Sequence, residues 1–227
     1  GDAGDTIVAS SGQDLVLGDN GSLIWDTSVD PPVLTQIRST QPEFGGDDNI
    51  QAGDNADVIL AGSGSDAVNA GTDEQHDIAI GDNGYLLLDL QGHVVEVVST
   101  GSQYGGIDTI ETGGGEDYVI AGDAGDEIDS AAGRDLVLGD HGTLVWDTSV
   151  DPPVLSEIRS TEPELGGDDV IEGGDDTDVI LAGTGADVVD AGGDNSSDFA
   201  VGDHGYAFFD DQGRLIEIGT AFHQFGG

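Results

Sequence analysis

The sequence predicts an all-β protein, a parallel β-roll or β-solenoid with periodic β-hairpin inserts aligned on one side. Aspartates recur every nine residues, an apolar residue, usually β-branched, follows two positions later, and a glycine-rich turn separates one step from the next. Helices are not expected anywhere, because no stretch has a 3.6-residue apolar period and glycine is too frequent for helix interiors.

The nine-residue step is clearest in residues 106–139, which read GIDTIETGGGEDYVIAGDAGDEIDSAAGRDLVLG. The aspartates of this stretch, each with the apolar residue that follows it, are Asp108 with Ile110, Asp117 with Val119, Asp126 with Ile128, and Asp135 with Val137. Each step therefore supplies a turn, an acid and a very short strand. Successive steps of this kind are typical of the coils of a parallel β-solenoid.

The charge of the chain is extreme. It has 4 Lys and Arg residues against 47 Asp and Glu residues, which gives a formal net charge of −43. Self-repulsion of this size opposes a compact state unless cations neutralise it, so divalent cations are the expected partners. The composition argues against nucleic acid as a binding partner, because nucleic-acid binding needs a basic patch. Membrane insertion is not expected either, because no apolar run approaches the length of about 18 residues that a membrane-spanning helix needs. Because cysteine is absent, disulfides and thiolate metal sites are not available.

The steps are grouped into one continuous repeat array over residues 1–227. The segment DLVLGDNG from Asp14 recurs as DLVLGDHG from Asp135, 121 residues later, and a Gly-Asp-Asn/His-Gly break interrupts the steps at Gly18, Gly81, Gly139 and Gly202. We expect residues 1–21 to be the end of a module. Residues 22–84 are predicted to form a module with a Trp/Pro-Pro hairpin (22–44) and a β-roll (45–84), and residues 85–142 a module with a short hairpin (85–104) and a β-roll (105–142). Residues 143–205 are expected to repeat the first module type, and residues 206–227 to form a second short hairpin.

The segments after each break are the predicted hairpins. From Tyr85 the sequence YLLLDLQGHVVEVVS has two apolar runs around a Gln-Gly pair, and a similar pattern starts at Tyr206. The other type turns at a Pro-Pro pair, where proline stays outside any strand ladder, and we expect Trp25 and Trp146 to lie in its core. Each module has four steps, hence two coils, so all hairpins emerge on the same side. Two coils advance by about 9.6 Å, the width of a hairpin, so neighbouring hairpins can pair into a further sheet.

The aspartates of the steps are the candidate metal ligands. A glycine turn aims backbone carbonyls inward and the aspartate adds a carboxylate, and Ca²⁺ takes roughly six to eight such oxygens. One turn has too few, so we expect multiple Ca²⁺ ions between successive turns, with alternate aspartates stacked, for example Asp108 with Asp126. The predicted ligands are Asp5, Asp14, Asp48, Asp57, Asp66, Asp77, Asp108, Asp117, Asp126, Asp135, Asp169, Asp178, Asp187 and Asp198. For the break residues Asp19, Asp82, Asp140 and Asp203, two roles stay open: capping the calcium row or holding the turn.

These steps resemble the RTX or haemolysin-type calcium-binding nonapeptide, Gly-Gly-x-Gly-x-Asp-x-apolar-x. AGSGSDAVN from Ala61 and AGTGADVVD from Ala182 fit the pattern well. Asn55 and Asp176 replace its third glycine, while SAAGRD from Ser130 and ASSGQD from Ala9 lose both early glycines. The resemblance implies a calcium-dependent β-roll, type I secretion and folding outside the cell, and the inserts resemble those of very large bacterial surface proteins.

The expected function is a calcium-dependent structural segment of a large secreted bacterial surface protein, an extender or fibre-forming, adhesin-like array at the cell surface. Its expected partners are calcium and neighbouring repeats, with lateral self-association into fibres as a further option. No enzyme activity or catalytic residue is expected, because no nucleophile, base and orienting acid recur together. Two alternatives stay open: an accessory module of a secreted hydrolase or polysaccharide-modifying enzyme, and a carbohydrate- or ice-binding module, for which regular Thr-x-Thr rows are missing.

Overall fold

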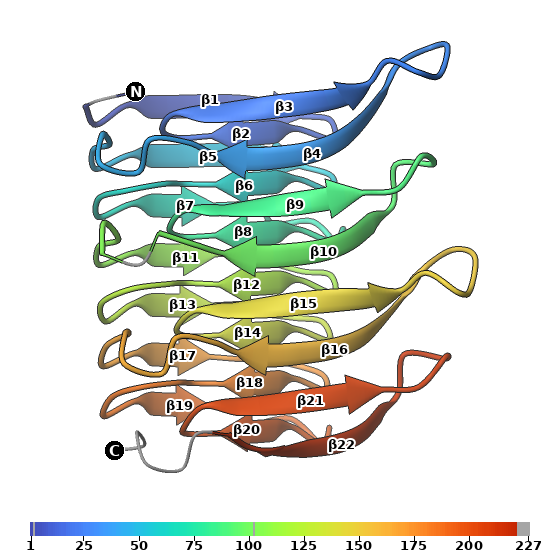
Figure 1. Ribbon diagram of the computed structural model, residues 1–227. Helices are drawn as coiled ribbons and strands as arrows, with labels where there is room; N and C mark the ends of the chain where they lie inside the picture. The colour runs from blue at the N-terminus through green and yellow to red at the C-terminus, as the bar shows by residue number, and fades with distance from the viewer. Residues whose placement is uncertain (2, 102, 222–227) are drawn as a thin grey trace.

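A computed structural model describes residues 1, 3–101 and 103–221 of the chain (Figure 1). The end of the last predicted module, residues 222–227, lies outside the described residues. All elements within the described part are β-strands, from β1 to β22, and the prediction of an all-β chain without helices is confirmed. It follows that this part of the chain has no helix that is long and apolar enough to cross a membrane.

Two parallel sheets of seven strands form the roll, with strands stacked in chain order and one strand of each sheet in every coil. The outer parallel sheet contains β1 (Thr6–Ser11), β5 (Asn49–Asp54), β7 (Ala67–Asn69), β11 (Thr109–Glu111), β13 (Glu127–Asp129), β17 (Val170–Glu172) and β19 (Val188–Asp190). The inner parallel sheet contains β2 (Leu15–Leu17), β6 (Val58–Leu60), β8 (Ile78–Ile80), β12 (Tyr118–Ile120), β14 (Leu136–Leu138), β18 (Val179–Leu181) and β20 (Phe199–Val201).

A third, antiparallel sheet of eight strands runs along the roll, in front of the parallel sheets in Figure 1. It contains β3 (Gly21–Asp26), β4 (Val33–Ser39), β9 (Gly84–Leu88), β10 (Val94–Ser99), β15 (Gly142–Asp147), β16 (Val154–Ser160), β21 (Gly205–Phe209) and β22 (Leu215–Thr220). Consecutive strands form four antiparallel pairs. Neighbouring pairs are joined edge to edge through β4 with β9, β10 with β15, and β16 with β21. The antiparallel sheet is therefore continuous.

The three sheets enclose two hydrophobic cores. Side chains such as Ile110 and Val119 fill the first core, between the parallel sheets, and both are fully buried. The second core lies between the inner parallel sheet and the antiparallel sheet, with Ile120, Leu138 and Leu144 among its buried residues. Because the inner parallel sheet is covered on both faces, its strands are apolar triplets such as VIL, whereas those of the outer parallel sheet alternate, as in TIE.

The two tryptophans of the long repeat differ in their surroundings. The Trp146 ring packs edge-on against the Tyr118 ring, with centroids 5.5 Å apart, and contacts the second core. Trp25 is 48% exposed, so the expectation of a core position holds for Trp146 and is wrong for Trp25.

Candidate calcium columns

The predicted ligands lie in two columns along the roll, each aspartate directly before a strand. The outer column leads into the outer parallel sheet and contains Asp5, Asp48, Asp66, Asp108, Asp126, Asp169 and Asp187. The inner column leads into the inner parallel sheet and contains Asp14, Asp57, Asp77, Asp117, Asp135, Asp178 and Asp198. Aspartates expected to stack, such as Asp108 and Asp126, are direct neighbours. The columns also continue across the breaks, for example from Asp66 to Asp108.

One oxygen of each stacked carboxylate, except those of Asp5 and Asp14 at the start of the columns, accepts a hydrogen bond from the backbone. The N–H of Asp108 donates to Oδ1 of Asp126 at 2.8 Å, and the N–H of Asp117 donates to Oδ1 of Asp135 at 2.8 Å. The same bond links every neighbouring pair in both columns, with N–O distances from 2.7 to 3.2 Å. These bonds fix the rotamer of each carboxylate and leave its second oxygen free for another partner.

The second oxygen is buried and has no hydrogen-bond partner in most of the column. This is the case for Oδ2 of Asp14, Asp48, Asp57, Asp66, Asp108, Asp117, Asp126, Asp135, Asp169, Asp178 and Asp187. Buried polar atoms in folded proteins nearly always have a partner, because an unsatisfied one is costly. Repetition of the same unsatisfied oxygen from coil to coil fits a row of bound cations.

Backbone oxygens approach the free carboxylate oxygens next to the glycines of the breaks. A Cβ atom added to Gly81 would overlap both Oδ2 of Asp108 and the carbonyl oxygen of Ala121. Gly139 stands in the same relation to Asp169 and Ala182. Among the described residues, no group of three or more His, Cys, Asp or Glu side chains could hold a metal by itself. Backbone carbonyl groups of the turns would therefore have to supply many of the ligands. Hard cations such as Ca²⁺ bind carbonyl oxygens as well as carboxylate oxygens.

Burial makes the column carboxyls hard to ionise without a cation. Burial raises the pKa of Asp66 to about 7 and that of Asp135 to about 8. For Asp108 and Asp126, burial and then the charge of a neighbouring aspartate raise the pKa to about 9 and about 10. A divalent cation beside these groups would reverse the effect, because an opposite charge favours the carboxylate.

The aspartates of the breaks have a different set of partners. Oδ1 of Asp82 accepts the N–H of Gly106 at 3.3 Å, and its Oδ2 accepts the N–H of Asp123 at 2.5 Å. Asp140 accepts in the same way from Gly167 and Thr184. Each carboxylate thus ties the segment that returns from the antiparallel sheet to the turn of the next coil, as expected of a residue that holds the turn.

Asp19 and Asp203 complete this set. Oδ2 of Asp19 accepts the N–H of Ser63 at 2.6 Å, while its Oδ1 is buried without a hydrogen-bond partner. For Asp203, the equivalent return segment falls in residues 222–227, outside the described residues.

Sequence reasoning missed two hydroxyl residues beside the inner column. Thr112 and Ser130 open the turns of Asp117 and Asp135, at positions where other steps have alanine, and both are fully buried. The Thr112 hydroxyl has no hydrogen-bond partner, whereas that of Ser130 donates to the Gly173 carbonyl at 3.0 Å. The available signal was a polar residue in place of a core alanine.

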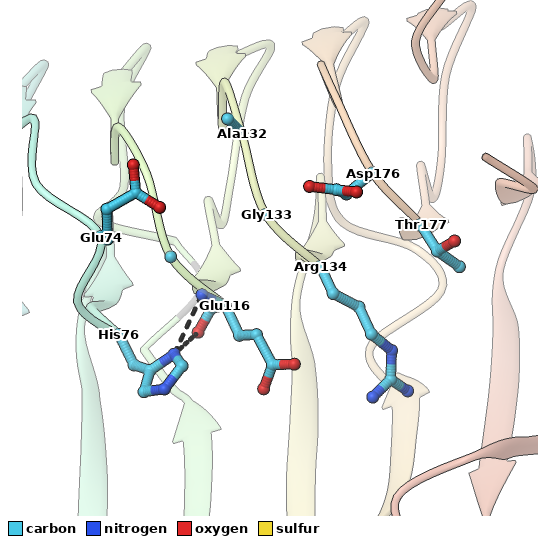
Figure 2. Close-up of a pocket in the computed structure, with 9 residues that line it drawn as sticks. Glu74, His76, Glu116, Ala132, Gly133, Arg134, Asp176 and Thr177 are labelled. Carbon is cyan, nitrogen blue, oxygen red and sulfur yellow. Dashed lines mark hydrogen bonds between the residues drawn. The ribbon is translucent and has the colours of Figure 1, made fainter. Parts of the chain in front are cut away.

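A cavity of about 600 Å³ lies on the rim of the inner column rather than within it. Figure 2 shows that the carboxylates of Glu74, Glu116 and Asp176 do not converge on a common point. The ring of His76 is held by the backbone of Glu116, whose N–H donates to Nδ1 at 2.9 Å. Arg134 extends away from the carboxylates of Glu74 and Asp176 and donates to the Gly213 carbonyl at 2.6 Å. The cavity is thus a surface groove and not a second metal site.

Comparison with known protein families agrees with this geometry. A family described as the RTX calcium-binding nonapeptide repeat matches the chain in four copies, at residues 1–22, 44–74, 104–137 and 165–197. These segments cover more than half of the chain and include every column aspartate except Asp77 and Asp198. No curated protein and no solved structure matches the chain.

Proposed function

The chain belongs to the RTX calcium-binding nonapeptide repeat family, and on that premise we propose that it is a structural segment of a large secreted bacterial surface protein, which folds on calcium binding outside the cell. Its role is that of an extender or fibre-forming, adhesin-like array without catalytic activity. The family is one of structural, generally non-catalytic calcium-binding repeats, which supports this role.

The fourteen column aspartates are the proposed calcium ligands, together with carbonyl groups of the adjoining turns. The free, buried Oδ2 atoms of eleven of them carry this assignment, since a cation is the partner that these oxygens lack, and Asp5, Asp77 and Asp198 are included because they continue the same columns. Bound calcium supplies positive charge between successive turns. The Oδ1 atoms of the same carboxylates accept backbone N–H groups and so fix the carboxylate orientation, and the first core aligns the strands. Asp19, Asp82, Asp140 and Asp203 hold the turns at the breaks.

The extender role follows from the repeat. Modules that begin with a hairpin and end with a β-roll, with the boundaries given above, add length in equal increments, and seven coils at the strand spacing span about 34 Å. The high negative charge prevents folding where calcium is scarce and permits it where calcium is abundant. Secretion of an unfolded chain by a type I pathway, followed by folding at the cell surface, is consistent with this dependence.

A calcium titration tests the proposal. In the presence of a chelator we expect the circular dichroism of a largely unfolded chain, and calcium should restore the β-sheet signal cooperatively. Magnesium is the matched control, because it demands octahedral geometry and retains its water, and it should not restore the signal at the same concentration. A β-sheet signal that is the same with chelator and with calcium would contradict the proposal.

A further inference from the structure

The antiparallel sheet has an outward face, which is the side that points away from the second core. Strand register places its side chains in two rows that cross all eight strands. On the first strand of each pair, one row carries Ile24, Leu87, Val145 and Phe208, and the other carries Ser22, Tyr85, Thr143 and Tyr206. Side chains of the opposite alternation, such as Leu86 and Leu144, enter the second core.

The second strands of the pairs carry the charges of this face. Glu96, Glu157 and Glu217 continue the apolar row, and Arg38 and Arg159 continue the other row. Two of the chain's four Lys and Arg residues therefore lie on one face, among three glutamates. The seven strands of the outer parallel sheet contain no Lys or Arg. Self-repulsion is therefore smaller on the outward face of the antiparallel sheet than on the outer parallel sheet.

Arg159 is held in place within this face. Its Nε donates to Oε1 of Glu157 at 2.6 Å, and its guanidinium lies 5.3 Å from the ring centroid of Tyr206 and 5.7 Å from that of Phe208. A guanidinium that is already oriented loses little conformational entropy when a partner arrives. The rings beside it supply apolar contact area.

We propose that this face binds the same face of a second copy of the chain, with the two rolls side by side and parallel. A twofold axis parallel to the roll exchanges the two rows on every strand. Phe208 then meets Tyr206 of the second copy, and Glu157 meets Arg159 of the second copy. Leu87 likewise meets Tyr85 of the second copy, and Arg38 meets Gln36, whereas Glu96 meets Val98 and Glu217 meets Gly219. The reciprocal contacts of Glu157 with Arg159 therefore supply the opposite charges that favour this orientation.

The size of the face predicts a weak contact for one chain and a strong one for an array. Eight strands at about 4.8 Å and about five residues at about 3.4 Å give a face of roughly 38 by 17 Å. This area is a little below the about 800 Å² per partner of a standard protein interface. Each added module extends the face by the same amount. The surface goes beyond the proposed function, because it gives an extender a lateral partner, and it requires only the folded roll.

Sedimentation velocity in calcium tests the inference on the chain itself, with circular dichroism of the same samples as the record of folding. We expect a concentration-dependent dimer at concentrations up to about 1 mM. Phe208→Ser, an outward-facing change, should weaken dimerisation at least tenfold. Val188→Ser is the matched control, since Val188 is 61% exposed on the outer parallel sheet, and it should leave dimerisation unchanged.

A charge exchange tests the orientation. Arg159→Glu should reduce dimerisation because it places glutamates of both copies together, and Glu157→Arg in the same chain should restore it. A folded chain that stays monomeric up to about 1 mM would overturn the inference and leave calcium-dependent folding untouched. A dimer that Phe208→Ser leaves unchanged would overturn it as well, because the contact would then involve another surface.

Discussion

Two sets of carboxylates stack at the strand spacing in this molecule, and only one of them has the features of a metal site. The columns are buried except towards their ends, where Asp5 is exposed, and most of their Oδ2 atoms lack hydrogen-bond partners. The acidic row of Glu111, Asp129, Glu172 and Asp190 is just as closely in register on the outer parallel sheet, but all four side chains are exposed. Water screens the acidic row, whereas the central aspartates of the columns are shielded from it. Register creates repulsion in both sets, and burial decides where a cation is required.

The largest expected effect is that of pH on the calcium-free chain. The folded-state pKa values of Asp108 and Asp126 lie near 9 and 10, above the ordinary value of 3.8. The folded chain therefore binds more protons than the unfolded chain, so its stability is highest below about pH 4 and is lost as pH rises through the raised values. With chelator present, the β-sheet signal should appear on acidification from about pH 8 to about pH 4.

Circular dichroism across this pH range provides the measurement. Sedimentation of each sample is the necessary control, because the sequence pI is about 4.1 and aggregation could add its own β-sheet signal. In calcium the trend should reverse, since protons compete with the metal for the carboxylates. A chelated chain whose spectrum stays constant from pH 8 to pH 4 would show that column repulsion is not what prevents folding.

Sequence periodicity was sufficient for the roll and its first core. Most apolar residues two positions after the column aspartates, such as Ile110, Val119 and Ile128, are buried there, while Ile7 and Val189 are partly buried and Ala200 is exposed at the ends of the roll. The nine-residue step determines which residues fill the first core, because each coil encloses it with only two short strands and one apolar residue per step is enough to fill that space. The absence of helices followed from the same period.

The second core was harder to predict, although its signal is present in the sequence. Triplets such as VIL at residues 58–60 are apolar at every position, and they occur in alternate steps. Whether such a triplet is covered depends on which parallel sheet the antiparallel strands pack against, which is a matter of tertiary structure. The role of Asp82 also depends on tertiary structure, because its two oxygens accept N–H groups from Gly106 and Asp123, which lie 24 and 41 residues away along the chain.

A matched pair of substitutions separates the buried column from the acidic row. Asp126→Asn and Asp129→Asn make the same chemical change three residues apart, one in the outer column and one in the acidic row. Asp126→Asn keeps an oxygen for the N–H of Asp108 but removes a charge between Asp108 and Asp169. We expect calcium affinity to fall at least tenfold at the sites next to Asp126, which corresponds to a loss of about 1.4 kcal/mol of binding free energy per site.

Isothermal titration with calcium measures this difference, and thermal unfolding in excess calcium gives a second reading. Asp129→Asn should leave affinity and stoichiometry at the wild-type values. Equal losses for the two variants would mean that net charge rather than column position controls binding, and the distinction between the two sets of carboxylates would be lost.

The smallest expected effect comes from the acidic row itself, and its sign is opposite. Asp129 lies between Glu111 and Glu172 on neighbouring strands, and like charges directly opposite one another in a sheet are destabilising. Asp129→Asn should therefore stabilise the calcium-bound chain by a few tenths of a kcal/mol, an advantage that decreases as salt is added. Thermal unfolding at low and high salt measures it, with Gln51→Asn, a neutral change at an exposed position of the same sheet, as the control. A loss of stability in Asp129→Asn at both salt concentrations would mean that the acidic row also holds a cation, and exposure would then no longer separate the two sets.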